Sequence, residues 1–219
     1  MTGETPKTVT HSVAHKGEGE RLFAPSAARN LGVLCDLLEQ VAPKTGKALE
    51  LASGTGQHVV GYGARLPGLM WQPSELDAQR RASIDAHVAD ADLRNIAPAT
   101  ALNATVAGWG GQHAGQALIM LSNLLHLISL EDTKVLIREA AMALKPGGRL
   151  VIYGPFMRAG ELTSDGDVSF HAGLIASDPV IGYKDDFDMM DLMQGAGLEM
   201  MEVIEMPANN LALVAQRVG

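Results

Sequence analysis

The sequence predicts an α/β protein of Rossmann-like design, with a seven-stranded, mostly parallel sheet, helices on both faces and an antiparallel terminal strand. Three observations predict this fold. Short apolar segments alternate with helical patterns over most of the chain, which is typical of parallel strands joined by helices. A glycine-rich turn follows the first of these segments, where such folds bind ligands. The final apolar segments, 198–207 and 209–218, follow each other closely and favour a terminal strand pair.

Composition and charge restrict the class of protein. The chain has 219 residues, of which 47% are hydrophobic and 19% charged, as expected for one globular domain. Its net charge is −8 and it has no Lys/Arg cluster, so a nucleic-acid partner is not expected. No apolar stretch approaches the roughly 20 residues that span a bilayer, and the polar start lacks the apolar core of a secretory signal. We therefore expect a cytoplasmic monomer or homodimer without a nucleic-acid or membrane partner.

The chain divides into a short arm and one domain. Residues 1–20 are polar and glycine-rich, which predicts a flexible arm. His11 and His15 are four residues apart and would share one face of a helix, but no stable helix is expected here, so no metal site is predicted. Residues 21–219 form the single domain, which a polar excursion at 157–184 interrupts. The single cysteine, Cys35, excludes an internal disulfide and is expected to be buried on the apolar side of a helix.

The strands are expected where short apolar segments end in turn residues or small residues. The predicted strands that precede the excursion are 47–52, 69–74, 97–104, 117–123 and 149–156, and the terminal pair completes the sheet.

The helices carry recognisable start signals. Ser26 can cap the leading helix, and Gln57 begins the helix that follows the glycine turn. Ser129 and Asp132 form a capping-box pattern at the start of the next long amphipathic helix. A final helix is expected from Asp185.

The turn in the sequence LELASGTGQH, residues 49–58, decides the class of ligand. A nicotinamide site requires a small residue three positions after the second glycine, but Val59 stands there. A nucleoside triphosphate loop requires Gly-Lys-Ser/Thr, which the chain lacks. The residues fit a different pattern, acid-x-small-x-Gly-x-Gly, made by Glu50, Ala52, Gly54 and Gly56. An acid at this turn would repel a pyrophosphate and favour a cation, such as the ammonium of an amino-acid moiety.

At this turn the sequence resembles the class I methyltransferases that depend on S-adenosyl-L-methionine (SAM), a ligand that joins an amino acid to a nucleoside. The resemblance implies a Rossmann-like methyltransferase fold, SAM as cofactor and S-adenosyl-L-homocysteine (SAH) as product. It also implies that Ser53 and the four residues of the pattern hold the cofactor.

Three further strand ends support the resemblance. Glu75 follows the second strand, where the superfamily places an acid that takes both ribose hydroxyls, although a helix-start acid is the alternative. Asn103 and Ala104 end the predicted third strand, where an Asp usually reads the adenine amino group; the Asn carbonyl oxygen can accept the same hydrogen bond. Ser122 and Asn123 end the predicted fourth strand, in a segment that passes beside the methionine part of SAM. The sequence LKPGGRLVI before the fifth strand is a frequent structural signature of this fold.

A narrower resemblance covers nearly the whole chain beyond the arm. The strings SAARN, ELASGTGQH, WQPSELD, YGPF and MPANN are similar to the methyltransferase-like 26 family, which implies the cofactor but no substrate. The sequence departs from that family at Asn103, His171 and Ile175, and the last two positions lie in the excursion. The substrate is therefore open.

Candidate residues for the chemistry lie above the carboxyl ends of the fourth and fifth strands. Methyl transfer needs alignment, exclusion of water and, for a hydroxyl or ammonium acceptor, removal of a proton. His126 is a candidate base and Tyr153 a candidate for orienting the acceptor, with packing as the alternative for each. Arg29 and Asn30 in the leading helix are expected to fold over the cofactor, whereas His58 is expected to cap local backbone. The candidate acceptor contacts are Phe156, Phe170, His171, Tyr183, Asn209 and Asn210.

The sequence therefore predicts a SAM-dependent methyltransferase with a small-molecule acceptor and no metal. The acidic composition disfavours nucleic-acid acceptors, and the excursion is too short for a domain that docks proteins. Two alternatives stay open: a non-catalytic SAM-binding or interaction module, and a nicotinamide-dependent reductase, against which Val59 argues.

Overall fold

A seven-stranded sheet runs through the centre of the structure, a computed structural model that describes residues 14–17 and 19–219. Its strands are β3 (Gly46–Leu51), β4 (Leu69–Pro73), β5 (Gln116–Ser122), β6 (Leu144–Met157), β7 (Lys184–Asp185), β8 (Leu198–Glu205) and β9 (Asn210–Arg217). The order is β4-β3-β5-β6-β9-β8, and β7 pairs with the end of β6. β3 to β6 pair in parallel, whereas β9 runs antiparallel to β6 and β8. The predicted α/β fold is confirmed.

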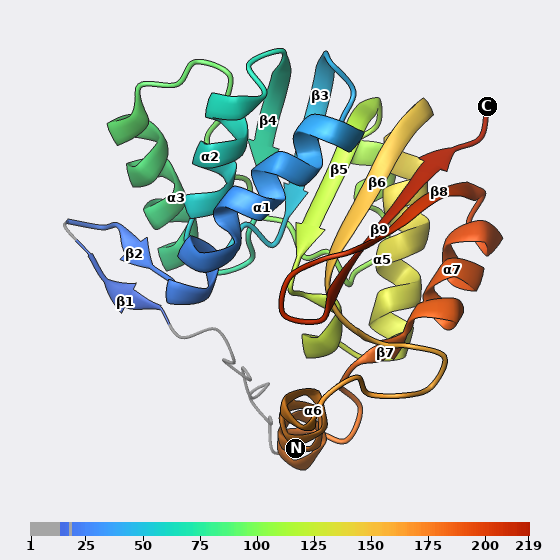
Figure 1. Cartoon of the computed structure of the whole chain (residues 1–219). Helices are drawn as coiled ribbons and strands as arrows, with labels where there is room; N and C mark the ends of the chain where they lie inside the picture. The colour runs from blue at the N-terminus through green and yellow to red at the C-terminus, as the bar shows by residue number, and fades with distance from the viewer. Residues whose placement is uncertain (1–13, 18) are drawn as a thin grey trace, which may run out of the picture.

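Helices cover both faces of the sheet (Figure 1). One face packs against α1 (Pro25–Val41), α2 (Gln57–Arg65) and α3 (Ala78–Ala91). The other face packs against α4 (Trp109–Gln112), α5 (Leu130–Ala143) and α7 (Asp186–Gly195). The 3₁₀-helix η1 (Leu125–Leu127) follows β5, and α6 (Asp165–Ser177) lies beyond the carboxyl ends of the parallel strands.

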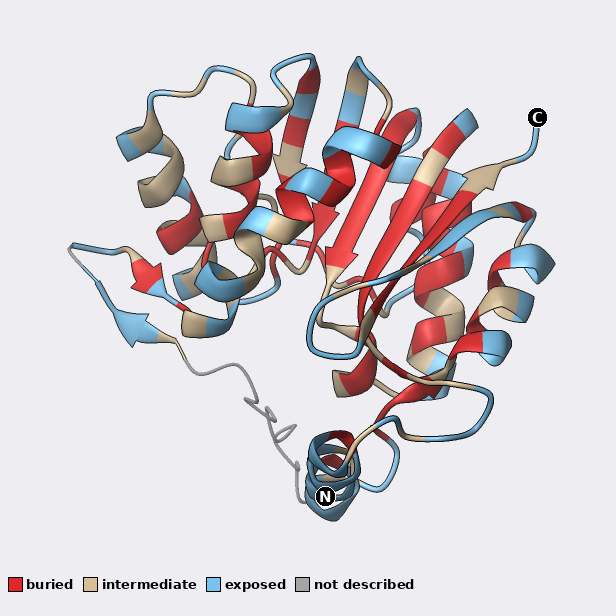
Figure 2. Ribbon diagram, viewed as in Figure 1, coloured by how far each residue is buried: buried red, intermediate tan, exposed pale blue. Residues whose placement is uncertain are grey.

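The core divides into two layers because successive strand residues point to opposite faces. In β5, Leu118 and Met120 join the layer under α1 to α3, while Ile119 and Leu121 join the layer under α5 and α7. Figure 2 shows the central strands buried along their length, as expected for parallel strands covered on both sides. Cys35 lies in the first layer, and burial raises the pKa of its thiol to about 11, so the predicted buried thiol is confirmed.

Residues 97–104, expected as the third strand, do not form one, and this prediction is wrong. The segment follows β4 in parallel, but only isolated bridges form, one of them between Ser74 and Thr100. Pro73 of β4 has no N–H to donate to the facing segment, so the ladder between the two segments is interrupted there. The seventh strand of the sheet is instead β7, at the end of the excursion.

The leading helix begins before the residue expected to cap it. Pro25 occupies the first turn and Ala24 is the N-cap residue, without a side-chain cap. The Ala24 N–H donates instead to Gln57 Oε1 at 2.6 Å. The prediction that Ser26 caps this helix is therefore wrong, because proline is favoured at the first helical position and a residue distant in sequence supplies the acceptor.

The capping box at α5 is confirmed. The Asp132 N–H donates to Ser129 Oγ at 3.0 Å, and the Ser129 N–H donates back to the Asp132 carboxylate. A similar start opens α6, where the Asp167 N–H donates to Ser164 Oγ at 3.2 Å. The excursion therefore contains a helix that its polar sequence did not predict.

The amino-terminal segment is described only in part. Residues 1–13 and 18, and with them His11, lie outside the described residues. The strand β1 (His15–Lys16) pairs antiparallel with β2 (Leu22–Phe23). The division into an arm and a domain stays a prediction.

Over residues 14–17 and 19–219, no group of three His, Cys, Asp or Glu side chains could hold a metal ion. In the same part of the chain, each helix is too short or too polar to cross a bilayer.

Candidate functional site

The turn between β3 and α2 is built from residues with left-handed backbone. Ala52, Gly54 and Gly56 have φ values of 52°, 59° and 95°. A Cβ atom on Gly56 would lie 2.7 Å from the Cα atom of Ile84, so glycine lets α3 pack closely against the start of α2. For Gly54, the nearest described atom to such a Cβ is Arg80 Nη1 at 4.0 Å. One glycine therefore serves packing, and the other leaves the backbone open to a ligand.

Glu50 lies at the end of β3 and is almost completely buried, with 2% of its surface exposed. Its Oε2 atom has no hydrogen-bond partner among the described residues. Burial raises the pKa of the carboxyl to about 8; a hydrogen bond from Ser53 opposes this shift, and the charge of Glu75 adds to it. A buried acid with an unpartnered oxygen has a capacity for a donor or a cation that the protein itself does not fill.

Glu75 fastens the glycine turn to the start of α3. Its carboxylate accepts the N–H groups of Gly54 at 3.0 Å, Leu76 at 2.8 Å and Asp77 at 3.2 Å. A carboxylate offers about four acceptor positions, so this geometry leaves about one for a ligand. The predicted contact with both ribose hydroxyls therefore exceeds the free capacity of the carboxylate in this geometry.

Asn103 forms a local turn. Its Oδ1 atom accepts the backbone N–H of Thr105 at 3.0 Å and the Thr105 hydroxyl at 2.8 Å. The two acceptor positions of this oxygen are therefore filled, which contradicts the prediction that it reads an adenine amino group. Ala104, predicted beside it, is buried, and its carbonyl oxygen accepts the indole N–H of Trp109 at 3.2 Å.

Polar residues from five elements meet at the carboxyl ends of β5 and β6. We call them the Tyr153 network, and they are Asn30 of α1, His58 of α2, Ser122 and Asn123 at the end of β5, Tyr153 of β6 and Asn210 of β9. Five of the six were predicted site residues, so the structure brings much of the predicted methionine and acceptor end together.

The orientation of the Asn30 amide follows from its neighbours. Its nitrogen lies 2.9 Å from the carbonyl oxygens of Ser26 and Ala27, which can only accept hydrogen bonds. In this orientation the nitrogen also lies 2.8 Å from His58 Nε2, and Asn30 Oδ1 accepts from Asn123 Nδ2 at 3.1 Å.

His58 is therefore a neutral imidazole with its proton on Nδ1. Because Nε2 accepts from Asn30, Nδ1 carries the hydrogen and faces Ser122 Oγ at 3.4 Å. Burial lowers the pKa of His58 to about 4, so the ring is neutral near pH 7. The expectation that His58 caps local backbone is wrong, since its ring joins two other elements.

The Tyr153 hydroxyl ends the network. It accepts a hydrogen bond from Asn210 Nδ2 at 3.1 Å. Burial raises the pKa of Tyr153, and hydrogen bonds with Asn30 and Asn210 oppose this shift. The phenol is therefore neutral, and its hydroxyl is held in one direction by amides from two ends of the chain.

The excursion gathers a second group of predicted residues around one carboxylate. Asp167 accepts hydrogen bonds from the Tyr183 hydroxyl and from Asn209 Nδ2, both at 3.0 Å. His171 Nδ1 accepts the Tyr183 N–H at 3.1 Å. The rings of His126 and Phe170 lie edge to face at 5.7 Å.

His126 is packed into this aromatic group. Its ring is buried, and its centroid lies 6.3 Å from that of Tyr183. The geometry favours the packing alternative over the general base.

Lys184 lies near the same group of residues. Its ammonium donates to the carbonyl oxygens of Ile128 at 2.7 Å and Gly182 at 2.9 Å. Burial lowers the pKa of Lys184 to about 8, with Asp132 opposing the shift.

Two predicted site residues lie apart from these groups. Phe156 has 2% of its surface exposed and packs in the core layer under α5 and α7, which contradicts its predicted contact with an acceptor. It follows Leu150 and Ile152 on the same face of β6, so the alternation of the strand accounts for its direction. Arg29 is exposed on α1.

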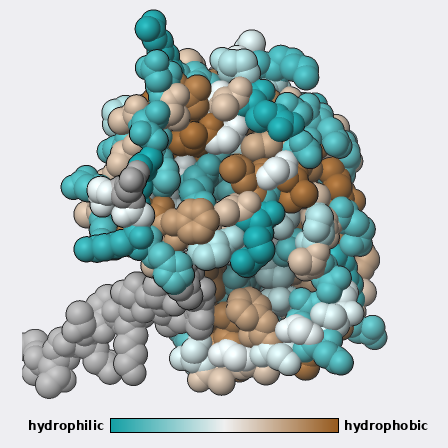
Figure 3. Space-filling model, turned by 60° about the vertical axis from the view of Figure 1, so that its left-hand side comes forward, coloured by the Kyte–Doolittle hydropathy of each residue, from teal (hydrophilic) through white to brown (hydrophobic). Residues whose placement is uncertain are grey.

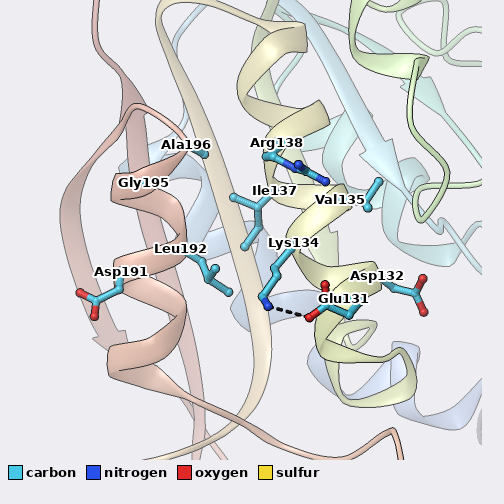
Figure 4. Close-up of a pocket in the computed structure, with 10 residues that line it drawn as sticks. All are labelled: Glu131, Asp132, Lys134, Val135, Ile137, Arg138, Asp191, Leu192, Gly195 and Ala196. Atoms are coloured by element: carbon cyan, nitrogen blue, oxygen red, sulfur yellow. Dashed lines mark hydrogen bonds and ion pairs between the residues drawn. The ribbon is translucent and has the colours of Figure 1, made fainter.

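A cavity of about 440 Å³ lies elsewhere, between α5 and α7 (Figure 4). Its lining includes Lys134, Arg138 and Asp191, and Lys134 pairs with Glu131 at 2.6 Å. None of the predicted site residues lines it. The face in Figure 3 carries separate hydrophobic patches among hydrophilic residues.

Two residues that connect these groups, His58 and Asp167, were not predicted as site residues from the sequence. His58 contacts residues 28 and 64 positions away, and Asp167 contacts Asn209 at a separation of 42 positions. For His58 a signal was present, because it directly follows the glycine turn. For Asp167 the only local signal was its position three residues after Ser164, which indicates a helix cap.

Comparison with protein families gives one match over most of the chain. The model of a family described as "Protein of unknown function (DUF938)" matches residues 21–217.

Comparison with solved structures finds similar folds at low identity. An O-methyltransferase family protein from Burkholderia thailandensis has a TM-score of 0.75 and 19% identity over 89% of this chain and 57% of that one. A putative O-methyltransferase from Nostoc punctiforme PCC 73102 has a TM-score of 0.76 and 15% identity over 88% and 57%. Human N-acetylserotonin methyltransferase in complex with SAM has a TM-score of 0.72 and 13% identity over 89% and 53%. The chain thus spans little more than half the length of these proteins, and the likeness shows a shared fold.

Proposed function

Since this chain belongs to the DUF938 family, whose description states no activity, we propose from its own site that it is a SAM-dependent methyltransferase with a small-molecule acceptor. The shared fold supports this proposal, because similar structures include O-methyltransferases and one complex with SAM. The proposed relation to the methyltransferase-like 26 family is narrower and is based on the sequence strings alone. A cytoplasmic location is likewise a proposal from composition.

The unpartnered oxygen of Glu50 is the observation that carries the proposal. It lies at the end of β3, beside a turn in which Gly54 leaves the backbone open. The ammonium of an amino-acid moiety beside the unpartnered oxygen would favour the ionised form of Glu50, whereas a phosphate there would raise the pKa of the carboxyl further. The residues therefore fit SAM, and those that would hold it are Glu50, Ala52, Ser53, Gly54, Gly56 and Glu75 on the turn side, with Asn30, Ser122 and Asn123 on the methionine side.

Val59 supports SAM over a nicotinamide cofactor. Its side chain is fully buried in the core layer under α1 to α3, so the branched residue fills the place where a dinucleotide motif needs a small one. Because both acceptor positions of Asn103 Oδ1 are filled, Asn103 and Ala104 no longer support an adenine contact through this atom. Arg29, which is exposed on α1, stays a proposed cofactor contact.

The residues of the chain would align the acceptor and exclude water. When bound, SAM supplies an electrophilic methyl group on sulfur, and its product is SAH. We propose that the Tyr153 hydroxyl, held by Asn210, orients the acceptor atom opposite the methyl–sulfur bond. Beyond the strand ends, the acceptor would be covered by residues of the excursion and the turn before β9, namely Phe170, His171, Tyr183 and Asn209. A thiolate acceptor needs no base, whereas a hydroxyl acceptor would lose its proton to solvent or to a further group.

Binding and turnover experiments separate this proposal from its alternatives. Isothermal titration with SAM, SAH and NADH should show binding of the first two only, and NADH binding alone would favour a reductase. Glu50→Gln should weaken SAM binding, while Glu131→Gln, which removes an exposed acid of α5, should not. Labelled SAM incubated with a fractionated cell extract should then yield a labelled small molecule. SAM binding without any labelled product would favour a non-catalytic module.

A further inference from the structure

His58 lies between two elements that would hold the methionine end of SAM. Its ring is buried and stacks on Tyr62, with centroids 5.8 Å apart and 13° between the planes. One ring nitrogen faces Asn30 of α1 and the other faces Ser122 of β5. The imidazole thus connects the leading helix to the strand end directly across the glycine turn.

The orientation of the Asn30 amide beside His58 determines which atom of Asn30 faces Asn123. The two hydrogens of the Asn30 amide nitrogen are shared among three acceptors, His58 Nε2 at 2.8 Å and the carbonyl oxygens of Ser26 and Ala27 at 2.9 Å, and Asn30 Oδ1 points to Asn123. Asn123 has a left-handed backbone with φ of 54°, and its N–H donates to the Tyr153 carbonyl oxygen at 2.8 Å. Without an acceptor at the Nε2 position, the Asn30 amide would lose one of the groups that fix its orientation.

We propose that His58 is a positioning residue, which fixes the Asn30 amide and, through it, Asn123 and the Tyr153 hydroxyl at the end of the site where cofactor and acceptor meet. The inference rests on the proposed function. His58 does not act as a base, since both ring nitrogens face protein groups and its pKa lies far below neutral.

Isosteric variants separate the two contacts of the ring. Glutamine places its terminal amide near the position of Nε2 and can replace the acceptor for Asn30. Asparagine places its amide near Nδ1 and can replace only the contact with Ser122. Phenylalanine fills the space and replaces neither. The matched control is His87→Gln in α3, because His87 Nε2 contacts the Leu22 carbonyl oxygen at 2.9 Å, outside the Tyr153 network.

The probe is SAH, measured by isothermal titration at 25 °C together with the thermal unfolding temperature of each variant. We expect His58→Gln and His87→Gln to bind SAH within about threefold of the unchanged protein. We expect His58→Asn and His58→Phe to bind about tenfold more weakly, as for a buried donor left unpaired. If the phenylalanine variant does not fold, the difference in SAH affinity between His58→Gln and His58→Asn still tests the proposal.

Two outcomes overturn the proposal in distinguishable ways. Equal loss of affinity in His58→Gln and His58→Asn, or losses that only follow the unfolding temperature, would show that His58 has a structural role alone. Absence of SAH and SAM binding by the unchanged protein would overturn the proposed function as well.

Discussion

The Asn209 side-chain amide donates a 3.0 Å hydrogen bond to the Asp167 carboxylate and so attaches the turn before β9 to α6. The same carboxylate accepts from the hydroxyls of Thr163, Ser164 and Tyr183. Burial alone would raise the pKa of Asp167, but these hydrogen bonds outweigh it and lower the pKa below its ordinary value. Asp167 therefore connects α6 of the excursion to the turn before β9.

Replacing Asp167 should loosen the excursion. Asp167→Ala leaves the hydroxyl of the buried Tyr183 without its acceptor and removes three further hydrogen bonds, so we expect the free energy of unfolding to fall by about 1–3 kcal/mol. Asp165→Ala, in the exposed first turn of the same helix, is the matched control and should change it little. Urea unfolding at pH 7 measures both, and equal effects would show that Asp167 contributes no more than an exposed acid of α6.

Glu50 should make stability depend on pH in an unusual direction. Burial raises its pKa from 4.5 to about 8, so between these values the folded protein binds more protons than the unfolded chain. The contribution of Glu50 to the free energy of unfolding should then fall as pH rises through this window, by up to about 1.4 kcal/mol per pH unit. Urea unfolding at pH 5, 6, 7 and 8 should show this decline in the unchanged protein and not in Glu50→Gln. Parallel curves for the two proteins would contradict the prediction.

The two glycines of the turn should differ in what they support. Gly56→Ala combines left-handed backbone with a Cβ 2.7 Å from Ile84 Cα, so we expect a loss of about 2–4 kcal/mol in the free energy of unfolding. Gly54→Ala meets only the backbone cost of about 1–2 kcal/mol, but it should weaken SAM binding because the methyl group faces the open side. Chemical unfolding and titration with SAM measure the two effects. The prediction fails if Gly54→Ala destabilises the fold more than Gly56→Ala.

Glu75 should affect both the turn and the cofactor. Glu75→Ala removes the acceptor for the Gly54 N–H, and we expect SAM binding to weaken by about 1–3 kcal/mol. Titration calorimetry with SAM measures the change, and Glu131→Ala is an exposed control. Unchanged affinity would remove Glu75 from the cofactor site.

The parts of the fold that sequence could predict are those decided by local chemistry. The Ser129–Asp132 capping box and the apolar runs of β3, β5 and β6 carry their own signals, because their partners are neighbours in sequence or their faces are both buried. The segment 97–104 shows where this fails: its residues are apolar enough for a strand, but Pro73 of the facing strand has no N–H to donate, so the ladder is interrupted. The helix α6 was missed because exposed apolar residues such as Val168 and Ile175 obscure any single buried face.

The candidate site was predictable in kind but not in its connections. Glu50, Asn123 and Tyr153 could be proposed from the sequence because each lies at or near a strand end, and parallel strands bring such residues to one edge. Phe156 also lies near a strand end. Because side chains alternate between the two faces of β6, however, Phe156 points to the face that packs in the core. The role of His58 depends on Asn30 and Ser122, which only the packing of α1 and β5 brings to its ring.

The place of β9 in the sheet has a consequence for biosynthesis. β9 lies between β6 and β8, so the backbone edge of β6 stays unpaired until residues 210–217 leave the ribosome. Unpaired edges of this kind are sites of aggregation in partly folded chains. Asn210 is the first residue of this strand and donates to the Tyr153 hydroxyl, so the Tyr153 network is complete only after β9 has paired with β6.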